Sequence, residues 1–190
     1  DLLMRVLYAT RPYEKVEGTS DNLYDKWSKK VYIDVAKGDI KEFKKNVNDI
    51  IDDFENVKVS RKKLPKVGIV GEILIKYHSF GNNDLVKKLE KEGAEVIVPE
   101  LMGFVKYCAY NSIVKQNLFK TSKTTAFIYK EALNIFDMYE KPIKKRLEKT
   151  RYRNVTDIYK LASNVEGILS TGNQTGEGWF LTAEMVELIN

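Results

Sequence analysis

KVGIVG at residues 66–71 and AEVIV at residues 94–98 are two short apolar runs that bracket a helical segment. Both runs have the length and the β-branched content of buried strands, and Pro99 ends the second because it cannot donate to a ladder. Residues 83–91 between them have helical spacing, and Gly93 after them is a common helix stop. A strand, a helix and a strand in this order predict a right-handed βαβ crossover with parallel strands.

Three elements are predicted before this unit. Residues 2–9 (LLMRVLYA) form an unbroken apolar run that ends before a proline, which predicts a buried strand. A helix is predicted from Thr19 or Ser20, which are good N-caps, to about Ala36. Another helix is predicted to begin at Asp39, because the apolar residues that follow recur at steps of three and four.

The sequence after Pro99 predicts mainly helices. One covers residues 104–116, a long one covers residues 121–148 and bends at Pro142, and a short one opens at Thr156. The chain begins with an apolar run and stops inside a predicted helix, so we expect a segment of a longer protein. We expect an α/β part over residues 1–103 and a mainly helical part over residues 104–170. A glycine-rich loop with its following helix is expected over residues 171–190.

The composition is typical of a globular domain. Hydrophobic residues make up 43% and charged residues 31% of the 190 positions, and no apolar run is long enough to cross a membrane. One cysteine, Cys108, excludes an internal disulfide and any zinc or iron–sulfur site of several cysteines held by this chain alone. Low cysteine use fits a reducing compartment, so we expect a cytoplasmic protein with no membrane partner.

The net charge of +5 has two explanations. A Lys-rich solvated surface accounts for it, because acidic residues are interleaved through almost the whole chain, and attraction to a polyanion would also produce it. We favour the first explanation, since the densest basic stretch, residues 141–153, contains Glu148 and lies on a predicted helix. Nucleic acid is therefore not an expected partner.

Three predicted loops, at residues 11–18, 71–81 and 99–104, follow the ends of the predicted strands. In open parallel sheets ligands bind outside the carboxyl ends of the strands, so these loops are expected to form one rim. The polar residues that they would gather are Arg11, Tyr13, Glu14, Glu72, Lys76, Tyr77, His78, Asn82 and Glu100. The basic ones could hold a phosphate or a carboxylate, and the alternative is that all are ordinary loop residues.

The loop TGNQTGEG at residues 171–178 also has two explanations. Its glycines, Gly176 among them, would let the backbone beside Glu177 approach a ligand or a partner closely. Composition favours the other explanation, a flexible turn between helices, and the loop lacks the spacing of a phosphate-binding motif. Cys108 has apolar and aromatic neighbours and is expected to be a buried small hydrophobe, while His78 has no orienting partner and is expected to be exposed.

Several short motifs follow one another in a specific order along the chain. They are RPYE at residues 11–14, GTSD at residues 18–21, KVGIVGE at residues 66–72, FGNN at residues 80–83, GAEV at residues 93–96 and PE at residues 99–100. The most distinctive is GNQTGEGW at residues 172–179. Taken together, they resemble the acyl-CoA dehydratase activase-related family, and the resemblance covers essentially the whole chain.

Members of this family are similar to component D of 2-hydroxyglutaryl-CoA dehydratase and to benzoyl-CoA reductase subunits. The resemblance implies a parallel three-layer, flavodoxin-like half-domain with an incomplete sheet and a large helical portion after the βαβ unit. It also implies an ATP-driven system in which an activator ATPase passes a low-potential electron from a [4Fe–4S] cluster to a dehydratase component that acts on an acyl-CoA. Arg11 and Lys76 would then contact an anion, and the rim residues with Gly176 and Glu177 would form the pocket.

Two departures restrict what this chain could hold. The ATPase phosphate loops are absent, and dehydratase components use several cysteine ligands where this chain has one. The resemblance therefore implies that a [4Fe–4S] cluster and ATP belong to the larger protein or a partner, with Cys108 as one ligand at most, and that this segment alone is inactive. The alternative is a non-catalytic module that docks the activator ATPase to its partner component through the helix from Thr121.

Overall fold

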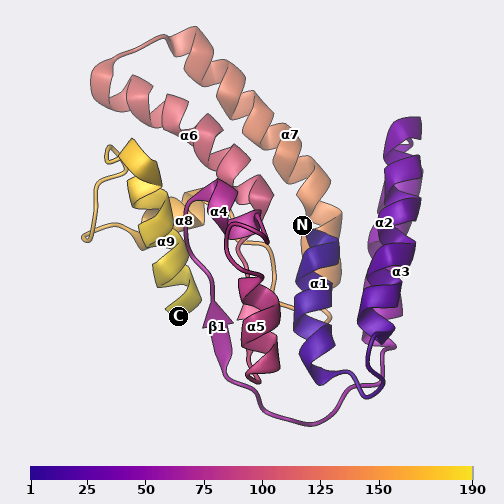
Figure 1. Cartoon of the computed structure of the whole chain (residues 1–190). Coiled ribbons are helices and arrows are strands. Elements are labelled where there is room, and N and C mark those ends of the chain that lie inside the picture. The colour runs from indigo at the N-terminus through magenta and orange to yellow at the C-terminus, as the bar shows by residue number, and fades with distance from the viewer. Residues whose placement is uncertain (190) are drawn as a thin grey trace. The chain divides into compact units, whose positions relative to one another are not determined.

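The spacing of apolar residues makes most of this chain helical. The computed structural model describes residues 1–189, and 66% of the chain is helix (Figure 1). The elements are α1 (Leu2–Thr10), η1 (Arg11–Tyr13), α2 (Thr19–Lys37), α3 (Ile40–Glu55), β1 (Lys66–Gly68), α4 (Ile73–Tyr77), α5 (Leu85–Lys91), β2 (Glu95–Ile97), α6 (Leu101–Phe119), α7 (Lys123–Leu147), α8 (Ile158–Asn164), η2 (Thr175–Glu177) and α9 (Gly178–Ile189). The fold is of the α/β class with a large helical portion.

The chain divides into two compact units, each built from several sequence segments. Unit 1 comprises residues 1–67, 86–97 and 140–155, and unit 2 comprises residues 68–85, 98–139 and those from 156 on. The two units group residues that contact one another in space. The predicted parts at residues 1–103, 104–170 and 171–190 instead group residues by their expected secondary structure. Those parts stay a prediction about a longer protein.

The prediction of a strand over residues 2–9 is wrong, because these residues form α1. The helix buries Val6 and Leu7 in the core of unit 1, and Leu3 and Tyr8 on its other sides are partly covered by the same core. It packs against α2, α3 and β2. An unbroken apolar run suits a helix surrounded by neighbours as well as a buried strand, and periodicity alone does not separate the two.

The predicted positions of α2 and α3 are confirmed. Asp39 caps α3, and its Oδ1 accepts hydrogen bonds from the backbone of Lys41 at 2.8 Å and Glu42 at 3.4 Å. The predicted apolar stripe of α3 is buried, with Ile51 and Phe54 fully enclosed. The core of unit 1 forms around this stripe.

The βαβ crossover is confirmed in reduced form. Strands β1 and β2 pair as a small parallel sheet, and α5 lies between them in the sequence. Each strand is three residues long, shorter than predicted. Two such strands are too small a sheet to assign a flavodoxin-like strand order.

Unit 2 contains a helix that the sequence analysis missed. Residues 72–81 were expected to be a long loop, but α4 occupies part of them. The predicted helices after Pro99 are confirmed as α6, α7 and α8, and α7 continues through Pro142. None of the helices among residues 1–189 combines the length and the apolarity that crossing a membrane requires.

The core of unit 2 gathers around the start of α9. Trp179 has no exposed surface, and Phe180 stacks on Tyr107 of α6 with ring centroids 4.8 Å apart. Leu133 of α7 and Ile158 of α8 complete the same core. Helices α8 and α9 lie beside one another in this unit (Figure 1).

Replacing Ile51 with Ala should lower the free energy of unfolding by about 2–5 kcal/mol, because the side chain is fully buried and its loss leaves a cavity. Ile40→Ala on the same helix is the matched control. Its side chain is 52% exposed, so we expect a change below about 0.5 kcal/mol. Urea denaturation monitored by circular dichroism measures both, and equal losses would contradict the assigned burial.

Candidate functional site

An ion pair buried between α4 and α9 is the best-defined polar group of unit 2. Lys76 Nζ lies 3.0 Å from Oε1 and 3.1 Å from Oε2 of Glu184, and the two side chains are 1% and 2% exposed. The rings of Tyr77 and Phe180 lie 5.4 and 6.0 Å from the same ammonium. A buried charge is tolerated only when it is paired, so each of these two side chains needs the other. The contact therefore joins α4 to α9 through two residues that are 108 positions apart in the sequence.

The carboxyl of the pair has an unusual affinity for protons. Burial raises the pKa of Glu184 to about 7, the Lys76 ammonium opposes this increase, and the carboxylates of Glu177 and Glu187 add to it. A carboxyl with this pKa exchanges its proton near neutral pH. The pair is closed to solvent, so Lys76 could contact an anion only if the pair opened, and its role in this structure is to hold α4 against α9.

The glycine-rich loop brings Glu177 close to this pair. Gly176 and Glu177 both have left-handed backbone, with φ of 61° and 60°, and this conformation is strained for a non-glycine residue. A Cβ at Gly178 would lie 2.9 Å from the carbonyl oxygen of Asn173, so only glycine fits. Partial burial raises the pKa of Glu177, and the carboxylate of Glu72 adds to this increase.

Hydrogen bonds tie the same loop to the core of unit 2. Tyr107 Oη donates to the carbonyl of Gln174 at 3.0 Å, and Trp179 Nε1 donates to Asn111 Oδ1 at 3.0 Å. The backbone N–H of Trp179 also donates to the carbonyl of Asn173 at 3.0 Å. These bonds hold the loop in one conformation, which disfavours a flexible turn; a close approach to a ligand or a partner stays a prediction.

Two of the predicted site residues brace α4. Glu72 is its N-cap, and Oε2 accepts a hydrogen bond from the backbone of Ile75 at 3.1 Å. Asn82 Nδ2 donates to the carbonyls of Ile75 and Lys76 at 2.9 and 3.2 Å. Both side chains therefore help to fix the helix that carries Lys76.

The predicted rim residues are divided between the two units. Arg11, Tyr13 and Glu14 belong to unit 1, and Glu72, Lys76, Tyr77, His78, Asn82 and Glu100 belong to unit 2. Tyr77 donates to the carbonyl of Pro99, and Glu100 is at the N-cap position of α6. His78 is exposed as predicted, and its Nδ1 accepts from the backbone of Gly81 at 2.9 Å. A single rim that gathers both groups stays a prediction.

In unit 1 the guanidinium of Arg11 is held by two carboxylates. Its Nε lies 2.8 Å from Glu90 Oε2, and its Nη1 lies 2.8 Å from Asp21 Oδ1. Tyr13 Oη donates to Glu95 Oε2 at 2.7 Å, and burial together with this bond raises the pKa of Tyr13 to about 12. Arg11 could contact an external anion only by giving up these partners.

The prediction that Cys108 is buried is wrong, because its side chain is exposed. Its neighbours Tyr107 and Ala109 are buried, but each step along a helix turns the side chain by about 100°, so Cys108 leaves the buried face. Partial desolvation and the carboxylate of Glu177 raise the pKa of the thiol, which disfavours the thiolate that binds metals.

The residues of this chain do not fit a complete iron–sulfur cluster. Such clusters are held by several cysteine thiolates, and the sequence contains one cysteine. Among residues 1–189 no three His, Cys, Asp or Glu side chains are grouped as metal ligands. A cluster would need ligands from outside this chain.

Glu184 is the residue of this site that the sequence analysis did not identify. It lies in α9 with the buried side chains of Trp179, Phe180 and Ala183 before it. A carboxylate on the buried face of an apolar helix was the available signal, since an enclosed charge needs a partner.

No protein-family model, curated protein or solved structure matches the chain in comparisons with known proteins. The resemblance of the motifs stays an expectation.

Replacing Lys76 with Met should destabilise unit 2, because it leaves the Glu184 carboxyl enclosed without its counter-charge. Loss of one partner from a buried pair costs about 3–5 kcal/mol. Lys115→Met on the exposed side of α6 is the matched control, with an expected change below about 0.5 kcal/mol. Urea denaturation compares the two, and a Lys76→Met variant as stable as the control would show that the pair is unimportant for stability.

Glu184 should also make stability depend on pH. Its pKa of about 7 in the folded chain exceeds the ordinary value of 4.5, so its stabilising contribution is complete below pH 4.5 and is lost as the pH rises through 7. The free energy of unfolding of the original chain should therefore exceed that of Glu184→Gln by an amount that falls as the pH rises from 4.5 through 7. Denaturation in pH steps measures it, and a constant difference would refute the assignment.

Proposed function

We propose that this chain is the dehydratase-like α/β domain, a flavodoxin-like half-domain, of a protein related to the activator of 2-hydroxyglutaryl-CoA dehydratase. It would belong to an ATP-driven, low-potential iron–sulfur electron-transfer system that acts on an acyl-CoA in the cytoplasm. The proposal starts from the resemblance of the sequence motifs. What supports it in the geometry is that two of those motifs contribute to one buried site in unit 2.

The two motifs are KVGIVGE, which ends at Glu72, and GNQTGEGW, which contains Glu177. Burial raises the pKa of Glu177 and of Glu184; the carboxylate of Glu72 adds to the first increase, and that of Glu177 adds to the second. The ion pair of Glu184 with Lys76 then fixes α4 against the helix that follows the glycine-rich loop. Residues from both motifs therefore influence the same ion pair, as expected if the two motifs build a common site.

In this proposal the buried pair positions the site and does not touch substrate. Its side chains are closed to solvent, whereas the backbone of the glycine-rich loop and the surface residues of α4 remain available for a pocket wall. The larger protein would supply the rest of the acyl-CoA pocket. Glu100 and Asn82 of unit 2 stay candidate contacts within it, and Arg11 of unit 1 stays a separate candidate for contact with an anion.

The cluster and ATP would come from the rest of the larger protein or from a dehydratase component. A bound [4Fe–4S] cluster supplies the low-potential electron. Cys108 is exposed on a helix and could contribute one thiolate if the charge of the cluster offset the raised pKa of its thiol. The residues of this chain would otherwise shape and support the pocket.

A larger protein that contains this chain, purified without oxygen, should hold iron, give the EPR spectrum of a reduced cluster, and bind an acyl-CoA in calorimetry. Cys108→Ser should alter the EPR spectrum if the thiol is a ligand, and Lys115→Ser on the same helix is the control that should not. An unchanged spectrum assigns Cys108 no ligand role. Absence of both iron and acyl-CoA binding from the larger protein would contradict the proposal.

A docking module between the activator ATPase and its partner component is the second candidate function, and α7 favours it. Phe127, Ile128, Ile135 and Met138 are each more than half exposed. On the helix they share an arc of about 100°, and the buried Leu133 lies outside that arc. Exposed apolar side chains gathered on one helix face are typical of a protein contact. We expect the activator ATPase to cover them.

Replacing Ile128 and Ile135 together with Ser should weaken binding of a purified activator ATPase at least about tenfold, because it removes apolar area from the contact. Lys130→Ser, on another side of α7, is the control and should bind normally. Biolayer interferometry measures the affinities. Unchanged binding by the double variant would exclude this face as the docking surface.

A further inference from the structure

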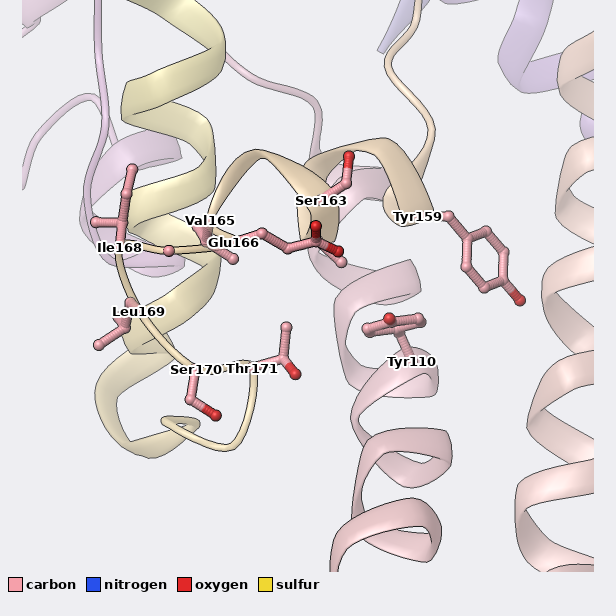
Figure 2. A pocket seen from close by; sticks show the side chains of 11 residues that line it. Tyr110, Tyr159, Ser163, Val165, Glu166, Ile168, Leu169, Ser170 and Thr171 are labelled. Atoms are coloured by element: carbon pink, nitrogen blue, oxygen red, sulfur yellow. The ribbon is translucent and has the colours of Figure 1, made fainter.

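A hollow of about 490 Å³ lies in unit 2 between α6, α8 and the loop that follows α8. A volume of this size suits a small ligand. Figure 2 shows Tyr110 and Tyr159 on one side of the hollow, with the side chain of Glu166 extending from the loop toward them. Ser170 and Thr171 lie on the part of the loop that leads into the glycine-rich segment.

The hollow is acidic although the protein is basic. Glu166 is the one charged side chain among the described residues that line it, while the chain as a whole carries +5. Burial raises the pKa of Tyr110, and the carboxylate of Glu166 adds to the increase. Burial also raises the pKa of Tyr159, and the carboxylates of Asp157 and Asp137 add to it. The charge carried by the described lining of the hollow is therefore negative.

The aromatic wall of the hollow is held in place by ring contacts. The rings of Tyr110 and Tyr159 meet edge to face, with centroids 5.4 Å apart and an angle of 90°. Tyr110 also contacts the buried ring of Trp179, with centroids 5.6 Å apart. Aromatic faces attract ammonium and guanidinium groups, and a nearby carboxylate strengthens that attraction.

We propose that this hollow binds a small organic cation, with Glu166 as its counter-ion and the rings of Tyr110 and Tyr159 as its walls. The same carboxylate repels an anion, and an apolar ligand would cover Glu166 without pairing it. The hydroxyl of Thr171 can accept a hydrogen bond from an N–H of a primary ammonium or a guanidinium, whereas Ser170 Oγ already accepts one from the backbone of Gly172 at 3.1 Å. The inference concerns a different part of unit 2 from the ion pair, so it does not depend on the proposed function.

Calorimetric titration of the unmodified chain with choline and with methylguanidine tests this site, choline for a quaternary ammonium and methylguanidine for a guanidinium. At least one of them should bind saturably and more weakly at high salt. The alcohol 3,3-dimethylbutan-1-ol has the shape of choline without its charge and should bind at least about tenfold more weakly than choline. If only methylguanidine binds, the site is assigned to guanidinium compounds.

Glu166→Gln should weaken binding of the cation about tenfold, and the exposed position of Glu166 allows the variant to fold. Glu131→Gln on α7 is the matched control and should bind as the original chain does. Tyr159→Ala is a second variant that should also lose affinity. The proposal is overturned if neither cation binds saturably, if the neutral alcohol binds as tightly as choline, or if Glu166→Gln has no effect.

Discussion

The requirement that a buried charge be paired constrains the structure of unit 2. Lys76 and Glu184 are enclosed together, so α4 must present its lysine toward α9 and α9 must turn a carboxylate inward. The start of α9 is anchored by Trp179, and Glu177 in the preceding loop lies within electrostatic reach of Glu72, the N-cap of α4. Glu177 has left-handed backbone in that loop. The strain at Glu177 is held by the contacts around it, as strained residues at sites generally are.

The net positive charge of the chain says little about its chemistry. Most basic side chains lie on the surface, where solvent screens them, and Arg11 is held by two carboxylates of its own chain. The informative charged groups are two glutamates in different surroundings. Glu184 is enclosed, so its pKa rises to about 7, whereas Glu166 lies at an open hollow beside aromatic rings. The first suits a positioning role and the second suits recognition of a cation.

Part of the candidate site could be predicted from the sequence. Glu72, Lys76 and Glu177 were singled out, and they lie around one buried site, although they serve it by capping a helix, pairing a charge and raising a pKa. Glu184 could not be found by loop position or motif, because its partner is 108 positions away. The exposure of Cys108 was also mispredicted, since apolar neighbours in sequence do not define which helix face is covered.

The sequence by itself determined features that depend on neighbours within a few positions. These are the helix capped by Asp39, the βαβ order, and most of the helices after Pro99, because capping and periodicity are local effects. Only the tertiary structure decided that residues 2–9 form a helix and that Glu184 meets Lys76. An apolar run suits several structures, and a charge gains a partner only when distant segments pack, so both outcomes depend on contacts that no local pattern contains.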